Sequence, residues 1–155
     1  GYDLERAGYV FAIAVAVAVP ARIGWGWLAS RLVKPATLLA LLGVAMAGAA
    51  ALAAIIGPGW PTWAATAVAI AFSATAVSWH GVLLAEVARL SPAGRIGATT
   101  GAVLAFGDAG ALILPLLFSA ALALTGGYAT GFLIGGALAL GVGLFGLWRR
   151  ANRGT

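Results

Sequence analysis

Residues 36–57 read ATLLALLGVAMAGAAALAAIIG, a stretch of 22 residues without a formal charge. As a helix rising about 1.5 Å per residue, this stretch is long enough to cross a hydrocarbon core about 30 Å thick. Its apolar residues do not alternate with polar ones, as they would in a strand of a membrane β-barrel. The stretch therefore predicts a transmembrane helix.

Four further apolar runs resemble this one in length and composition. They cover residues 7–29, 62–86, 97–125 and 128–148, with short segments rich in Pro, Gly or basic residues between them. Lipid tolerates no unpaired backbone groups, so we expect all five runs to be helices. The sequence predicts an all-α, polytopic transmembrane bundle of five spanning helices within one domain, residues 1–155.

The composition excludes the main soluble classes. Hydrophobic residues make up 63% of the chain and charged residues only 8%, whereas a soluble domain carries about 25% charged residues. High hydrophobicity also excludes intrinsic disorder. With no cysteine and one histidine, the chain has too few groups for a metal site or a catalytic triad. We expect no enzyme activity, no metal and no cofactor.

The charges predict an orientation in the membrane. The net charge of +5 does not form a patch for nucleic acid, because the basic residues lie between the apolar runs. Loops with an excess of Lys and Arg face the cytoplasm. The N-terminus is therefore expected outside and the C-terminus in the cytoplasm, in a multi-pass protein of a bacterial inner membrane. The basic residues assigned to the cytoplasmic side are Arg31, Lys34, Arg89, Arg95, Arg149, Arg150 and Arg153.

Four polar residues inside the apolar runs are candidates for a substrate or coupling site, because polar groups in membrane helices usually face a cavity or the bundle interior. Asp108 would be a proton-coupling or cation-binding carboxylate, or a structural partner of another polar group. Arg22 would recognise an anionic group, or serve in gating or an ion pair. His80 would relay protons or simply pack, and Ser78 would line the site.

Other residues are expected to shape the helices and the cytoplasmic side. Pro20 and Pro115 lie within apolar runs, where proline removes a backbone hydrogen bond and kinks a helix. Glu86 and Arg89 are three residues apart, a spacing that favours an ion pair with a structural or gating role.

Two segments carry a family resemblance. Residues 22–34, RIGWGWLASRLVK, resemble the cytoplasmic loop motif Gly-x-x-x-Asp-Arg-x-Gly-Arg/Lys-Arg/Lys of the major facilitator superfamily. Gly26, Arg31 and Lys34 match it, whereas Ser30 stands where the family has Asp. Val33 replaces the second Gly of the motif, and Pro35 replaces its last basic residue.

Residues 79–101, WHGVLLAEVARLSPAGRIGATTG, are similar to the tenth helix, following loop and eleventh helix of the same superfamily. Arg95 belongs to the Pro-x-x-Arg-x-Gly part of that loop. The segment from Tyr2 to Gly8 resembles the outside loop before the eighth helix. The resemblance covers nearly the whole chain and assigns it to helices eight to twelve.

The resemblance implies a fragment of a secondary active transporter, a symporter or antiporter that moves a small solute by alternating access. Its expected partners are that solute, the lipid bilayer and the missing N-terminal half of the same chain. A non-transporting membrane scaffold or assembly subunit is the alternative. Such a protein would use the small-residue stripe of Gly127, Gly131, Gly135, Ala139 and Gly143 to bind partner helices.

Overall fold

The computed structural model describes residues 3–57 and 59–152, and within them the predicted all-helical fold is confirmed. The predictions for Tyr2 and Arg153 lie outside the described residues. Five helical segments are long and apolar enough to cross a membrane, which fits a multi-pass membrane protein. The helices are α1 Leu4–Arg31, α2 Pro35–Ala54, α3 Thr62–Ala76, α4 His80–Leu90, α5 Ile96–Thr125 and α6 Tyr128–Ala151.

The third apolar run differs from its prediction. The sequence predicts one helix over residues 62–86, whereas the structure has α3 and α4 separated by residues 77–79. Together the two helices still form one candidate span, Thr62–Leu90. The interruption lies near the middle of this span, so it would fall within the hydrocarbon region of a membrane.

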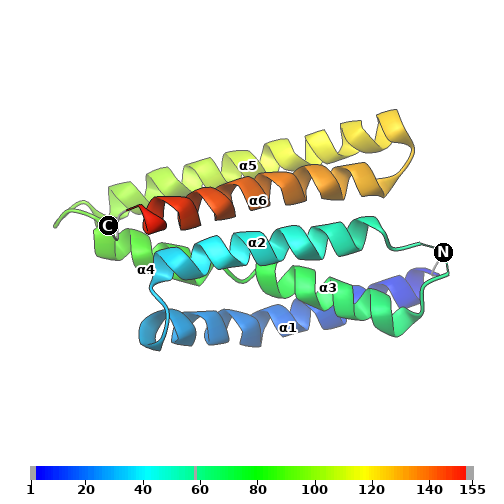
Figure 1. Ribbon diagram of the computed structural model, residues 1–155, viewed down its shortest axis with the longest axis horizontal. Helices are drawn as coiled ribbons and strands as arrows, with labels where there is room; N and C mark the ends of the chain where they lie inside the picture. Colours follow the sequence, from blue (N-terminus) through cyan, green and yellow to red (C-terminus); the bar gives the residue numbers. More distant parts are fainter. Residues whose placement is uncertain (1–2, 58, 153–155) are drawn as a thin grey trace.

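The helices are arranged around α2, with α5 and α6 on one side and α1, α3 and α4 on the other (Figure 1). The connections after α1 and α4 lie at the same end of the bundle as the C-terminus, and those after α2 and α5 lie at the opposite end. The basic loops predicted for the cytoplasmic side therefore share one end of the fold, called the basic end below.

A cluster of buried hydrophobic side chains lies near the basic end. Leu38 and Leu42 of α2 pack against Val82 of α4, and all three are almost fully buried. Trp25 and Leu28 of α1 pack against this cluster from the other side. The cluster fixes α4 between α1 and α2, which places the interruption of the third span beside α1.

Close contact between α2 and α6 depends on glycine. A Cβ atom on Gly143 would lie 2.8 Å from the carbonyl oxygen of Ala40 and 2.9 Å from the amide nitrogen of Val44. On α2, a Cβ atom on Gly43 would lie 3.0 Å from the carbonyl oxygen of Ala139. Small residues therefore bring the two backbones together, as in other membrane helix pairs.

The contact stripe on α6 differs in register from the predicted one. Gly136, Gly143 and Gly146 lie against α2, whereas Gly135 faces open space. Gly131 lies under the ring of Phe118 of α5 instead. With Ala139, whose carbonyl oxygen lies against Gly43, the residues of α6 that contact α2 recur at intervals of three and four, the spacing of helices that cross at a small angle, rather than every four.

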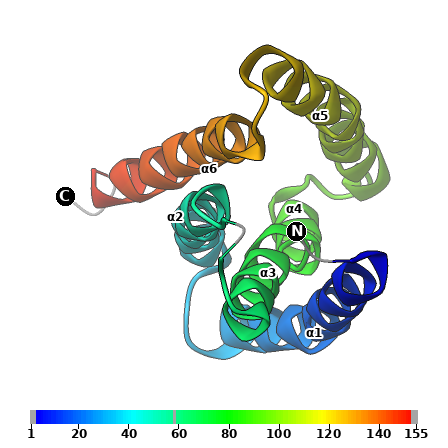
Figure 2. The same ribbon diagram turned by 90° about the vertical axis from the view of Figure 1, so that its right-hand side faces the viewer.

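Helix α5 is the least covered part of the bundle. It contacts α6 and α4 but makes no contact with α1 among the described residues, and it stands apart from α1 when the bundle is viewed end-on (Figure 2). None of the most hydrophobic part of α5 is buried. A long apolar surface therefore faces the surroundings between α5 and α1.

Candidate functional site at the interrupted third span

The interruption of the third span is held by a buried serine. The Ser78 side chain is fully buried, and its hydroxyl donates to the carbonyl oxygens of Ser73 and Ala74 in α3. A serine that bonds to carbonyls of the preceding turn competes with the regular hydrogen-bond pattern of a helix. Trp79 adds a second bond, from its indole nitrogen to the carbonyl oxygen of Ala76 at 2.8 Å.

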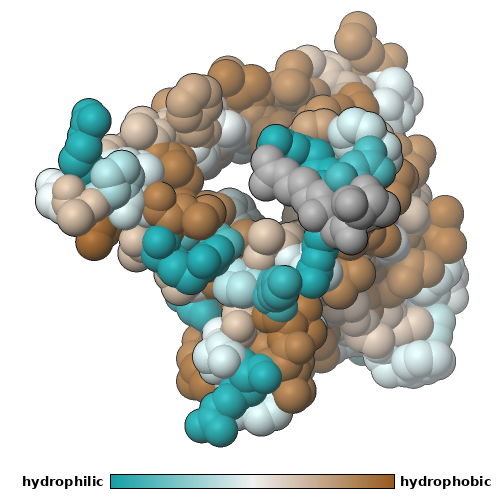
Figure 3. All heavy atoms as spheres, turned by 60° about the vertical axis from the view of Figure 1, so that its left-hand side comes forward, coloured by the Kyte–Doolittle hydropathy of each residue, from teal (hydrophilic) through white to brown (hydrophobic). Residues whose placement is uncertain are grey.

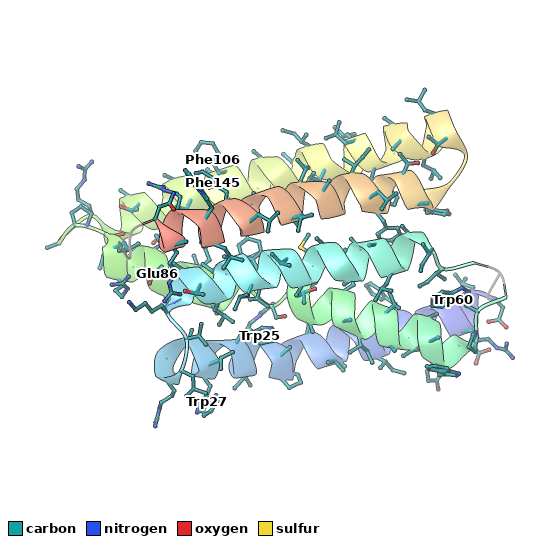
Figure 4. The ribbon with its side chains drawn as sticks, in the orientation of Figure 1. Trp25, Trp27, Trp60, Glu86, Phe106 and Phe145 are labelled. Carbon is teal, nitrogen blue, oxygen red and sulfur yellow. The ribbon has the colours of Figure 1, made fainter. Side chains whose placement is uncertain are left out.

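Helix α1 supplies two further donors to the end of α3. The Nη2 atom of Arg22 lies 3.2 Å from the carbonyl oxygen of Val77, and Trp25 Nε1 lies 2.8 Å from that of Ala74. Arg22 and Trp25 are three residues apart and therefore lie on one face of α1. Figure 4 shows Trp25 pointing from α1 toward the interruption. The two side chains satisfy carbonyl groups that a continuous helix would pair internally.

His80 begins the second half of the span. Its Nδ1 atom lies 3.3 Å from the same Val77 carbonyl oxygen that accepts from Arg22. Its ring stacks on Trp79 with the centroids 4.2 Å apart. His80 and Arg22 are both exposed, so both present polar atoms on the open side of the interruption.

One polar atom at this site has no partner. The Ser73 hydroxyl is buried and makes no hydrogen bond with the described residues. Buried hydroxyls are normally paired, so Ser73 leaves a free polar group one helical turn before the interruption.

The structure thus brings together three of the four predicted site residues, Arg22, Ser78 and His80, around a short non-helical segment.

Asp108 is not among them. It is exposed on α5 and makes no hydrogen bond or ion pair with the described residues. By the helical rise, Asp108 lies about 18 Å along α5 from Ile96, and Arg22 lies about 13 Å along α1 from Arg31. The two charges therefore lie at comparable depths from the basic end but on helices that do not touch.

Trp25 is a site residue that was not singled out from the sequence. The available signal was its spacing of three from Arg22 on α1. A tryptophan on the same helix face as an arginine within the membrane span is placed to contact the same neighbouring helix.

The predicted gating residues line the basic end. Ser30 donates to the carbonyl oxygen of Trp27 within its own helix, at 2.8 Å. Gly26 faces open space. Arg31 lies in the last turn of α1, and Lys34 is the N-cap residue of α2 without a side-chain capping bond. Ser30 is therefore bonded locally and fastens no second helix.

The predicted ion pair of Glu86 and Arg89 is present. Arg89 Nε and Nη2 donate to the two carboxylate oxygens of Glu86, each at 2.7 Å. The Glu86 side chain is only 10% exposed, whereas that of Arg89 is 64% exposed. Figure 4 shows Glu86 at the basic end of the bundle. Arg95, six residues after Arg89, is the N-cap residue of α5. Its side chain is exposed and makes no capping hydrogen bond.

Both predicted kink residues lie within helices, Pro20 in α1 and Pro115 in α5. Pro115 also lines an apolar pocket of about 460 Å³ between α5, α6, α2 and α3. Phe118 and Phe132 in that pocket meet edge to face, with ring centroids 5.4 Å apart.

In the described ranges, no three His, Cys, Asp or Glu side chains are grouped so that they could hold a metal ion. No family model, no curated protein and no solved structure matches this chain. The resemblance to the major facilitator superfamily accordingly stays a prediction from the motifs.

Proposed function

We propose that this chain is part of a secondary active transporter that moves a small polar solute across a bacterial inner membrane by alternating access. The proposal rests chiefly on the interrupted third span, which exposes polar groups in the middle of an otherwise apolar bundle. Discontinuous helices near the bilayer midplane are a recurring feature of transporter binding sites.

In this proposal, Arg22 and His80 bind polar groups of the solute. Arg22 uses one donor on the Val77 carbonyl, and a guanidinium has five donors in all. Its remaining donors are available on the exposed side of α1. The start of α4 adds the positive end of a helix dipole at the same place. These groups favour a solute with a carboxylate, phosphate or other acceptor-rich group.

Asp108 supplies the coupling to protons. Ionisable side chains within membrane helices commonly mark ion pathways and proton relays. The comparable depth of Asp108 and Arg22 along their helices supports a role at one central site. The missing helices of the same chain would cover the exposed face of α5 and close this site from the lipid.

The scaffold alternative relies on small residues of α6 that are free to bind a partner helix. Of the predicted stripe, Gly143 is instead occupied by α2 and Gly131 by Phe118 of α5, whereas Gly135 faces open space. The observed packing therefore favours the transporter.

Accessibility of the interruption tests the proposal without knowledge of the solute. The chain contains no cysteine, so Val77→Cys provides a single reporter thiol once any cysteines elsewhere in the full-length protein are replaced. In proteoliposomes, a membrane-impermeant maleimide should label this thiol from either face, because alternating access opens the site to both sides in turn.

Leu138→Cys is the matched control. Leu138 is 53% exposed on α6, near the middle of that helix, and as a lipid-facing residue it should react from neither face. Labelling of Val77→Cys from one face only, or from neither, would contradict alternating access and favour the scaffold.

A further inference from the structure

The basic end contains a second site, distinct from the interrupted span. A pocket of about 730 Å³ lies between the start of α2 and the end of α6. Its charged lining residues are Lys34 of α2 and Arg149 and Arg150 of α6. None of the three forms an ion pair with a carboxylate of the described residues. Three positive charges around one pocket, without acidic partners, create a positive potential that favours binding of an anion.

An uncharged polar side chain, Thr37, lies in the same pocket near the start of α2. Thr37 lines the pocket, and its hydroxyl oxygen is buried beside it without a hydrogen-bond partner among the described residues. Thr37 lies three residues after Lys34, so both are on one face of the first turn of α2. The positive end of the α2 dipole points toward the same place. A phosphate group would match the three charges and this helix end together.

The wall formed by α6 changes from basic to apolar with depth. Val142, Phe145, Gly146 and Arg149 line the pocket at intervals of three and four residues, which places them on one stripe of the helix. Val142 lies about 10 Å deeper along the axis than Arg149. Phe145 is 56% exposed, and its ring lies 5.7 Å from the guanidinium carbon of Arg149. Figure 4 shows Phe145 on α6 near the basic end.

This arrangement has the polarity of a phospholipid. The charged part of the pocket lies at the end of the bundle, where headgroups would be, and the apolar part lies where acyl chains begin. Hydrophilic residues gather on the end of the molecule, and hydrophobic surface covers the flanks of the helices behind it (Figure 3). A soluble anion would match the charges but would leave the stripe of Val142 and Phe145 unused.

We propose that the pocket binds an anionic phospholipid, with its phosphate between Lys34, Arg149 and Arg150 and an acyl chain along Val142 and Phe145. Basic pockets between transmembrane helices bind anionic headgroups in this way. Because the lipid would contact both α2 and α6, it would also strengthen the pairing of these helices at the basic end.

The test is binding of defined lipids to the purified full-length protein, measured by native mass spectrometry and by thermal unfolding in detergent. Phosphatidylglycerol should bind and raise the melting temperature, whereas phosphatidylcholine should do neither. Each of Lys34→Gln, Arg149→Gln and Arg150→Gln should weaken phosphatidylglycerol binding about fivefold, the effect of one cation near an anionic lipid surface.

Arg95→Gln is the matched control, because Arg95 is an exposed basic residue of the same end that does not line the pocket. It should leave lipid binding unchanged. An equal loss in Arg95→Gln and the pocket variants would show general attraction to a charged surface and overturn the proposal. So would equal binding of phosphatidylglycerol and phosphatidylcholine.

Two further arms separate the lipid from a soluble anion. Glycerol 3-phosphate should neither stabilise the protein nor displace the lipid at millimolar concentration. Phe145→Ser should weaken lipid binding, because it removes apolar contact with the acyl chain while leaving all three cations. Stabilisation by glycerol 3-phosphate equal to that by the lipid would identify a phosphate site and contradict the lipid site.

Discussion

The indole nitrogen of Trp25 donates a hydrogen bond of 2.8 Å to the main-chain carbonyl oxygen of Ala74, and so joins α1 to the interrupted end of α3. Two residues later on α1, Trp27 is 56% exposed and points away from the bundle (Figure 4). The two tryptophans differ in role although they are neighbours in sequence.

Replacing Trp25 should destabilise the fold more than replacing Trp27. Trp25→Phe keeps an aromatic side chain but removes the indole donor, leaving the Ala74 carbonyl with one partner fewer. Hydrogen bonds between membrane helices contribute about 0.6 kcal/mol on average and up to about 1.7 kcal/mol. We expect a loss of that size, measured by thermal unfolding in detergent. Trp27→Phe should unfold at the temperature of the parent protein, and equal losses in both would contradict the assigned role.

A methyl group at Gly143 should disrupt the α2–α6 contact. The new Cβ would lie 2.8 Å from a backbone oxygen and 2.9 Å from a backbone nitrogen, and neither can move without displacing α2. Overpacking of this kind costs about 1–3 kcal/mol. Gly143→Ala should therefore lower the melting temperature.

Gly135→Ala is the control for Gly143→Ala. Gly135 is on the same helix, but a Cβ atom there meets nothing within 4 Å. Alanine is the better helix former by about 1 kcal/mol, so this variant should be neutral or slightly stabilised. A larger loss for Gly135→Ala than for Gly143→Ala would show that the two helices do not pack as described.

Replacing Glu86 and replacing Arg89 should lower the stability of the protein by different amounts. Arg89→Gln leaves a nearly buried carboxylate without its bidentate donor, whereas Glu86→Gln leaves a mostly exposed guanidinium. An unpaired buried charge is the more costly state. Stability should fall more in Arg89→Gln than in Glu86→Gln.

The double variant Glu86→Gln with Arg89→Gln should recover much of the loss seen in Arg89→Gln, because it removes the unpaired charge. The thermal unfolding temperatures of the four proteins form a double-mutant cycle. A purely additive cycle would mean that the two side chains do not interact.

Asp108→Asn should uncouple solute movement from the proton gradient. The amide keeps the shape of the carboxyl group but cannot exchange a proton. In proteoliposomes of the full-length protein, tested with a solute found by uptake screening, accumulation driven by a pH gradient should disappear. Exchange of labelled for unlabelled solute should continue, because it needs no net proton movement.

Asp108→Glu keeps a titratable group and should retain part of the gradient-driven uptake. Undiminished accumulation in Asp108→Asn would rule out the proposed coupling role of this residue.

Much of the fold follows from local sequence properties. Apolar runs of about 20 residues predict spanning helices whatever their neighbours are, and loop charges place the basic ends together. Glu86 and Arg89 could be paired from their spacing alone, since residues three apart on a helix are adjacent. The small residues of α6 predicted a close contact, although their register against α2 depended on the crossing of the two helices.

The sequence by itself thus determined the number of spans, their approximate ends and the sharing of one end by the basic loops. Only the tertiary structure decided that the third span is interrupted at residues 77–79. Ser78 can bond to the preceding turn in any helix. The backbone carbonyl groups that lose their helical partners at the interruption would be unpaired, however, unless α1 supplied hydrogen-bond donors to them. Trp25 and Arg22 meet Ala74 and Val77 across about 50 residues of sequence, and no local pattern encodes that contact.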